Sequence, residues 1–187
     1  KKAFTASNLK KISNSLKNEQ KIFNIFLSGG DTVVSKKLTF SITTVGFSNK
    51  IIYRNNAKIN DDIYVTGNLG DSYIGLKILK KKLNFKKLNT YFLNKYFLPD
   101  IQIKITSKLF KFANTSIDIS DGLISDLDKL INKQNLSYKL YLNKIPVSKN
   151  LKKLISMKRG INKLSVISNG DDYQVLFTAP SSKSNII

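Results

Sequence analysis

The stretch "SIDISDGLISDL", from Ser116 to Leu127, constrains the fold more than any other part of the chain. Ile117 and Ile119 alternate with polar residues, as in a strand, and a Ser-Asp-Gly turn then leads into a helix. A strand that passes into a helix through so short a turn favours a fold in which helices pack on a sheet. Asp118 lies within the expected strand, where we expect a buried carboxylate that needs a partner.

The remaining segments add strands and helices in mixed order. We expect α/β or α+β architecture, without internal repeats, and a boundary between two domains near Ser48–Lys50. Apolar residues at helical spacing predict helices over 8–23, 72–83, 90–97, 101–113 and 147–158. Alternating β-branched and aromatic residues predict strands over 37–47 and 137–143, within 60–71, and over 173–180.

The composition restricts the available chemistry. The chain has no cysteine and no histidine, which excludes disulfides, a thiol nucleophile, serine–histidine catalysis and His-ligated zinc for this segment. Acids, bases and metal ligands must therefore come from Asp, Glu, Lys or Tyr. We find no apolar run long enough to span a membrane and no signal peptide. Because the chain begins with Lys-Lys and not with Met, we expect an interior piece of a longer protein.

The net charge of +20 raises the question of a nucleic-acid partner. Arginine is the better reader of phosphates and bases, yet only two of the 32 basic residues are arginine. The lysines are spread over almost every expected helix. Lys, Asn and Ile share AT-rich codons, so genome composition explains the charge at least as well. We therefore do not expect nucleic acid as the partner.

The acidic residues, in contrast, are concentrated. Five of the twelve acids lie beside apolar segments in three short motifs that contain glycine, "GGDT", "DISDG" and "NGDDY": Asp31, Asp118, Asp121, Asp171 and Asp172. Glycine allows a backbone to approach a ligand closely, and N–H groups at turns and helix starts bind phosphate. Carboxylates beside such turns hold hard cations such as Mg²⁺. The three motifs together are consistent with a site for a magnesium–nucleotide complex.

Each motif also has a simpler interpretation. Asp31 could bond the backbone of an ordinary turn, and Ser120 or Asp121 could serve only as a helix N-cap. Arg54 is either a phosphate ligand or an ordinary surface cation. We interpret Asp71 as the cap of the helix that follows it. Two further acids, Asp126 and Asp128, are expected to be solvent-exposed residues on a helix surface.

Four stretches, taken in order, resemble the thiamine-monophosphate kinases: "SGGDT", "YRNNAKINDDIYVTGNLGDSYIGL", "IDISDGLISDL" and "NGDDYQVLFTAP". These kinases belong to the superfamily of aminoimidazole ribonucleotide synthetase and selenophosphate synthetase. The resemblance runs from about residue 26 to residue 180. It implies the two-domain α/β fold of that superfamily, cytoplasmic location, a homodimer formed by the N-terminal halves, and magnesium-dependent transfer of the ATP γ-phosphate to thiamine monophosphate.

The resemblance also assigns roles to residues. Gly30, Asp31, Arg54 and Ser120 would contact ATP, and Asp171 would face the thiamine phosphate. The ligands of Mg²⁺ would be Asp31, Asp118 and Asp121. Phosphoryl transfer of this kind depends on charge neutralisation and alignment of the reactants, and it needs neither histidine nor cysteine.

Some features depart from the family pattern. Asn55 and Asn56 stand where the family usually has Ser-Gly, Asn169 stands in place of a glycine, and Gln174 in place of a common Glu. The first and last segments of the family are not represented. We expect residues 1–48 to complete an N-terminal domain and residues 49–187 to form most of a C-terminal domain, with the fragment alone inactive. The alternatives are another ATP-using member of the superfamily and a non-catalytic RNA-binding protein.

Overall fold

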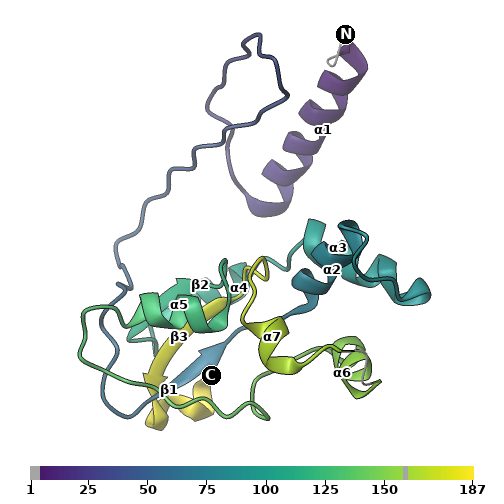
Figure 1. Cartoon of the computed structure of the whole chain (residues 1–187). Coiled ribbons are helices and arrows are strands. Elements are labelled where there is room, and N and C mark those ends of the chain that lie inside the picture. Colours follow the sequence, from purple (N-terminus) through teal and green to yellow (C-terminus); the bar gives the residue numbers. More distant parts are fainter. Residues whose placement is uncertain (1–4, 158–159) are drawn as a thin grey trace. The chain divides into compact units, whose positions relative to one another are not determined.

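The structure, a computed structural model, describes residues 5–157 and 160–187. The chain divides into two compact units, Lys1–Phe47 and Ser48–Ile187, which are described separately below (Figure 1). None of the helices in the described ranges is long and apolar enough to cross a membrane.

The first unit contains helix α1, Ala6–Phe23. The Thr5 side chain accepts a hydrogen bond from the Asn8 N–H and caps the start of this helix, and Asn24, in the left-handed conformation, ends it. The predicted helix over 8–23 is therefore confirmed. The predicted strand over 37–47 is wrong, because this segment forms no ladder. A strand requires a hydrogen-bonded neighbour, which the described residues of this unit do not provide.

The second unit is built on a three-stranded antiparallel sheet. Its strands are β1 (Asp61–Val65), β2 (Thr115–Asp118) and β3 (Val175–Pro180). The strand order is β1-β3-β2, so that the last strand of the chain lies between the other two. In the register, Tyr64 is opposite Phe177 and Ile117 is opposite Leu176.

Helices pack near this sheet and are also grouped beyond one end of it, where α2, α3 and α6 lie (Figure 1). They are α2 (Asp71–Leu79), α3 (Asn89–Phe97), α4 (Ile103–Leu109), α5 (Leu123–Leu130), α6 (Lys149–Ser156) and α7 (Lys163–Ile167), with 3₁₀ turns at Lys86–Leu88 and Ser181–Ile186. All helices predicted for this part of the chain are present, although α2, α4 and α6 are shorter than the predicted ranges 72–83, 101–113 and 147–158. The last residue of the range 147–158 lies outside the described residues. The short helix α7 was not predicted.

The predicted strand over 137–143 is also wrong, since the segment has no regular secondary structure. Part of the segment and strand β1 both line a cavity of about 1090 Å³. Alternation of apolar and polar residues predicts which side chains face inward, but it does not supply the hydrogen-bonded neighbour that defines a strand.

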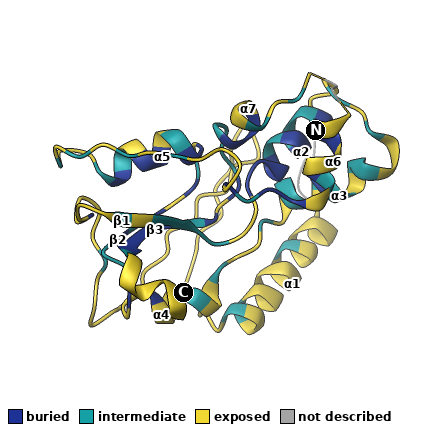
Figure 2. Cartoon of the chain, turned by 90° about the horizontal axis from the view of Figure 1, so that it is seen from below, coloured by how far each residue is buried: buried dark blue, intermediate teal, exposed yellow. Residues whose placement is uncertain are grey.

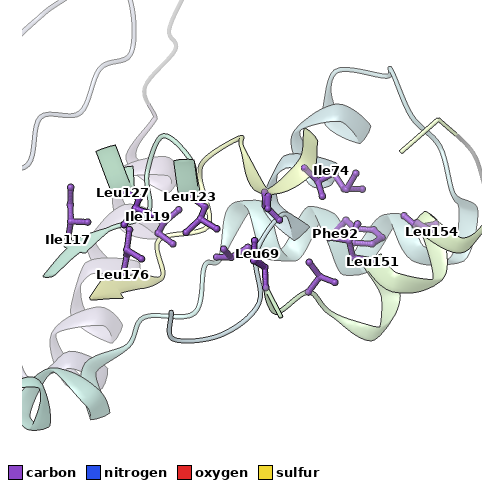
Figure 3. Packing of buried hydrophobic residues seen from close by; sticks show 14 of the residues in the cluster. Leu69, Ile74, Phe92, Ile117, Ile119, Leu123, Leu127, Leu151, Leu154 and Leu176 are labelled. Atoms are coloured by element: carbon purple, nitrogen blue, oxygen red, sulfur yellow. The ribbon is translucent and has the colours of Figure 1, made fainter. Parts of the chain in front are cut away.

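Two groups of side chains form the main core of this unit. Ile117, Ile119, Leu123, Leu127 and Leu176 pack where α5 covers one face of the sheet (Figure 3). Towards α2, α3 and α6 the same core continues through Leu69, Ile74, Phe92, Leu151 and Leu154. A smaller cluster, Leu109, Phe112, Phe177 and Ala179, packs α4 against the sheet. Figure 2 shows buried residues on α2 and α5, whereas α1 has none.

Candidate functional site: two aspartate turns

Two of the three acidic motifs meet in the second unit. The first turn, residues 118–122, begins at the last residue of β2, and the second turn, residues 169–172, precedes β3. The N–H of Asp171 donates to the Ser120 carbonyl at 3.0 Å. Ile119 exchanges two backbone hydrogen bonds, donating to Gln174 and accepting from Tyr173, both at 2.8 Å. Because β2 and β3 are paired neighbours, the continuation of their ladder brings the two turns side by side.

Glycine makes this close approach possible. A Cβ atom at Gly170 would lie 1.8 Å from the Ser120 carbonyl oxygen, and one at Gly122 would lie 2.5 Å from the Ser168 carbonyl oxygen. Both contacts involve backbone atoms, which have little freedom to move. Gly122 also has a φ of +128°, which other residues rarely adopt. The glycines of "DISDG" and "NGDD" therefore serve the packing of one turn on the other.

Asp126 holds the first turn in place, which corrects our expectation of an exposed surface acid. Its side chain is 1% exposed, and its Oδ2 atom accepts the backbone N–H groups of Ser120, Asp121 and Gly122 at 2.9, 2.9 and 3.0 Å. Burial alone would raise the pKa of this carboxyl. The hydrogen bonds from Lys129 and from the backbone outweigh burial and lower the pKa below its usual value.

The side chains of Asp118 and Asp121 point to solvent. The expectation that Asp118 is buried is wrong: it is exposed at the end of β2, because Ile117 and Ile119 take the core side of the strand. Asp121 is exposed as well and forms an ion pair with Lys129. The Lys129 ammonium also lies 2.8 Å from Oδ1 of Asp126. Hydrogen bonds to Asp121 and Asp126 raise the pKa of Lys129.

Asp172 connects the second turn to the start of α2. Its side chain is 4% exposed, and it accepts the N–H groups of Gly70 at 2.7 Å and Ser72 at 3.4 Å. A carboxylate at a helix N-terminus is favourable because the first N–H groups have no partner within the helix. Burial nevertheless dominates and raises the pKa of Asp172 to about 7, with the nearby Asp71 charge adding to the increase.

Asp71 does not cap α2, contrary to expectation. The cap position belongs to Gly70, and Asp71 is the first residue of the helix. Its carboxylate is buried and accepts hydrogen bonds from the hydroxyl groups of Tyr91 at 2.7 Å and Ser148 at 2.8 Å. Burial raises the pKa of this carboxyl, although the two hydrogen bonds oppose the increase. Asp71 therefore links α2 to α3 and to the start of α6, while Asp172 satisfies the helix N-terminus.

Arg54 is solvent-exposed, on a segment that is fixed on both sides of it. The Tyr53 carbonyl accepts the Thr115 hydroxyl at 2.7 Å, and the Asn55 N–H donates to the Leu130 carbonyl at 2.8 Å. Asn55 has a φ of +59°, a conformation that asparagine tolerates better than most residues. The backbone on which Arg54 stands is therefore attached to the first residue of β2 and the last residue of α5, the ends of these elements that lie away from the first turn.

The third motif lies in the first unit. Asp31 is exposed and accepts its neighbour's N–H, from Thr32, at 2.7 Å. Nothing lies within 4 Å of a Cβ built on Gly30. Within residues 5–157 and 160–187, no three acidic side chains are grouped closely enough to hold a metal ion together. The structure thus brings together Asp118, Ser120, Asp121 and Asp171, and it describes Gly30 and Asp31 separately.

Sequence reasoning missed Asp126 and Lys129, and it identified Asp172 without its role. A signal for Asp126 was present, since it shares the apolar face of α5 with Leu123, Leu127 and Leu130, where a surface acid does not belong. No comparable signal existed for Asp172, because its partners in α2 are about 100 residues away.

Curated relatives of the chain are thiamine-monophosphate kinases. One from Leptospira interrogans is 34% identical over 171 residues, which cover 90% of this chain and 54% of the relative. Another, from Buchnera aphidicola of Acyrthosiphon pisum, is 39% identical over 183 residues, which cover 95% of this chain and 55% of the relative. The chain thus spans about half the length of the curated relatives it matches. These similarities confirm the resemblance inferred from the four motifs. No protein-family model matches.

Solved structures give the same result for the fold. The crystal structure of thiamine monophosphate kinase from Aquifex aeolicus is 26% identical, has a TM-score of 0.82, and is matched over 97% of this chain and 62% of its own. A structure described as AaThiL complexed with AMPPCP and TMP is 31% identical and has a TM-score of 0.65. The match covers 72% of this chain and 44% of that structure's chain. A HypE–HypF complex, 19% identical with a TM-score of 0.69 over 98% and 61%, shares the fold. The predicted mixed fold of this superfamily is confirmed.

Proposed function

We propose, from the similarity of this chain to about half of a thiamine-monophosphate kinase, that the protein transfers the γ-phosphate of ATP to thiamine monophosphate with the help of Mg²⁺. The products are thiamine diphosphate and ADP. One observation carries this proposal: two aspartate turns from distant parts of the sequence are packed against each other through main-chain hydrogen bonds. A relative that is 31% identical is described as a complex with AMPPCP and TMP, an ATP analogue and the phosphate acceptor.

The residues of the first turn fit a magnesium ion by their chemistry. Asp118 and Asp121 offer exposed carboxylate oxygens, the ligand type that Mg²⁺ prefers. Since Mg²⁺ usually retains waters and phosphate oxygens, two protein carboxylates suffice without a third nearby. When bound, the ion would neutralise phosphate charge. We assign Asp31 to the same role from the first unit, on the strength of the resemblance alone.

The protein's own residues would bind and orient the reactants. Asp118 and Asp121 lie on a turn whose N–H groups are fixed by Asp126, so the carboxylates are held by a rigid backbone. We assign Ser120, Gly30 and Arg54 to ATP, with the Arg54 guanidinium as a phosphate donor. Asp171, on the adjacent turn, would then face the thiamine phosphate. Such positioning accounts for most of the catalysis in phosphoryl transfer.

The remaining assignments also follow from the similarity. We assign residues 1–48 to the N-terminal domain, through which we propose that two copies pair, and residues 49–187 to the C-terminal α/β domain. We further propose that the protein acts in the cytoplasm, where its substrates ATP and thiamine monophosphate would be available.

Mass spectrometry of the reaction products tests the proposal. The native-length protein is incubated with ATP, Mg²⁺ and thiamine monophosphate, in parallel with Asp121→Asn and with Asp128→Asn as the matched control from the same helix region. We expect thiamine diphosphate from the wild type and the control, and at least a hundredfold less from Asp121→Asn, the scale on which a lost transition-state charge partner acts. Folded wild-type protein that forms no thiamine diphosphate would refute the proposed reaction.

A further inference from the structure

The first turn already carries a cation of its own. The ammonium group of Lys129 forms an ion pair with Asp121 and at the same time lies 2.8 Å from Oδ1 of Asp126. Lys129 is eight residues beyond Asp121, on the helix that the turn begins. One positive charge is therefore shared by an exposed carboxylate and a buried one.

The position of this ammonium is fixed from the buried side. The Asp126 carboxylate is 1% exposed, and its second oxygen, Oδ2, accepts three backbone N–H groups. Asp126 therefore has no freedom to follow the lysine side chain, and it holds Lys129 next to the turn. The Asp121 side chain, in contrast, is 62% exposed and can move away from the lysine.

We propose that Lys129 is a built-in counter-cation that competes with a divalent metal ion for the Asp121 carboxylate and so sets the metal affinity of the turn. The inference rests on the proposed function, which assigns Asp121 to a metal ion. Two cations on one carboxylate repel each other, so a metal ion displaces Lys129 from Asp121. Lys129 then retains its contact with Asp126, whose backbone hydrogen bonds are unaffected. Lys129 is thus a residue that tunes cation binding without being a ligand.

Titration of the full chain with Mn²⁺ alone, followed by the electron paramagnetic resonance signal of free Mn²⁺, tests this inference. We expect Lys129→Met to bind Mn²⁺ about three- to tenfold more tightly than wild type, the range set by an exposed ion pair and the loss of one nearby charge. Lys129→Arg restores the competing charge and should bind within about twofold of wild type. Lys133→Met, which removes an exposed lysine four residues further on, is the matched control.

Two additional variants identify the carboxylate. In the Lys129→Met background, Asp121→Asn should remove the gain in affinity, whereas Asp128→Asn should leave it. Far-ultraviolet circular dichroism checks that each variant is folded before its Mn²⁺ affinity is compared with that of the wild type. Equal Mn²⁺ affinity of wild type, Lys129→Met and Lys133→Met would overturn the inference, and so would weaker binding by Lys129→Met.

The failure of this inference is distinguishable from failure of the proposed function. If Lys129→Met gains no Mn²⁺ affinity while the native-length protein still makes thiamine diphosphate, only the inference is refuted. If no variant binds Mn²⁺ and no thiamine diphosphate forms, both are refuted.

Discussion

Asp126 and Asp172 have the same structural task but opposite electrostatic outcomes. Each is buried, and each accepts backbone N–H groups that would otherwise have no partner, at the first turn for Asp126 and at the start of α2 for Asp172. The pKa of Asp126 is nevertheless lowered, and that of Asp172 is raised to about 7. Burial is the largest influence on both groups and raises the pKa of each. At Asp126 the hydrogen bonds from the Lys129 ammonium and the backbone outweigh burial, whereas at Asp172 the backbone hydrogen bonds do not, and the Asp71 carboxylate adds to the increase.

This comparison shows that hydrogen bonds from N–H groups do not by themselves keep a buried carboxylate charged. With the Lys129 cation beside it, the Asp126 carboxylate stays ionised below neutral pH. Without such a cation, the Asp172 carboxyl group, which links the second turn to α2, changes its charge near neutral pH. The turn that carries Asp118 and Asp121 is thus held by a carboxylate that is charged at neutral pH, and the turn that carries Asp171 by a carboxyl group that titrates near neutral pH.

The largest effect is expected where the two turns touch. Gly170→Ala places a Cβ atom 1.8 Å from the Ser120 carbonyl oxygen, and the turns must separate. We expect a loss of about 4 kcal/mol or more in the free energy of unfolding, measured by urea denaturation. Gly46→Ala, where a Cβ atom meets nothing within 4 Å, should change it by less than about 0.5 kcal/mol. Similar stability of the two variants would show that the turns are not in close contact.

Removal of the Asp126 carboxylate should have the next largest effect. Asp126→Ala leaves three backbone N–H groups without their acceptor and removes one of the two carboxylates that pair with the Lys129 ammonium. We expect a loss of about 3 kcal/mol in the free energy of unfolding. Amide hydrogen exchange should also accelerate at residues 120–122. The control Asp128→Ala removes an exposed acid from the same helix, together with its hydrogen bond from the Tyr138 hydroxyl at 2.7 Å, and should cost less than about 1 kcal/mol. Unchanged exchange at the turn would contradict the role of Asp126.

The pH dependence of stability tests the other half of the comparison. The pKa of Asp172 is about 7 in the folded protein, against 3.8 for an ordinary aspartate, so the folded state retains a proton that the unfolded state releases. The contribution of Asp172 to stability is therefore full below about pH 4 and is lost as the pH rises through 7. We expect a decrease of roughly 2 kcal/mol between pH 5 and pH 7 from this group.

Urea denaturation at pH 5, 6, 7 and 8 measures this decrease. Asp172→Asn should make the decrease in stability with rising pH smaller. Asp71, whose pKa is also raised, still contributes a decrease of the same sign in this variant. Asp126 does not interfere, because its lowered pKa puts its titration at more acidic pH. Identical pH dependence of wild type and Asp172→Asn would show that Asp172 stays ionised throughout this range.

The smallest effect on stability is expected at Asp118. Its carboxylate is exposed, so Asp118→Asn should change the free energy of unfolding by less than about 0.5 kcal/mol. Thermal unfolding without ligand measures this directly. A large loss of stability would instead indicate that Asp118 supports the turn, as Asp126 does.

The sequence predicted well those parts of the fold that depend on local pattern. The passage from β2 through the 118–122 turn into α5 was predicted because it lies within consecutive residues. The segments 37–47 and 137–143 have the alternation of strands, but pairing depends on a neighbour that the pattern does not reveal.

The site was predicted unevenly for the same reason. The motifs that combine acids with glycine pointed to Asp118, Asp121 and Asp171, and the structure places these residues on adjacent turns. The supporting contact of Asp172 with α2 joins residues about 100 positions apart, and no local pattern encodes it. Asp126 was misjudged because a single aspartate on a helix usually faces solvent, whereas this one faces the turn before its own helix.

Magnesium-dependent binding of ATP tests the central claim most directly, namely that the first turn serves a metal–nucleotide complex. Isothermal titration of the native-length protein with ATP, with and without Mg²⁺, compares the wild type with Asp118→Asn and with the control Asp128→Asn. We predict that Mg²⁺ strengthens ATP binding to the wild type and the control, and that Asp118→Asn weakens this binding at least tenfold, because a charged ligand of the ion is lost. ATP binding that is the same in all three proteins, or indifferent to Mg²⁺, would contradict the account.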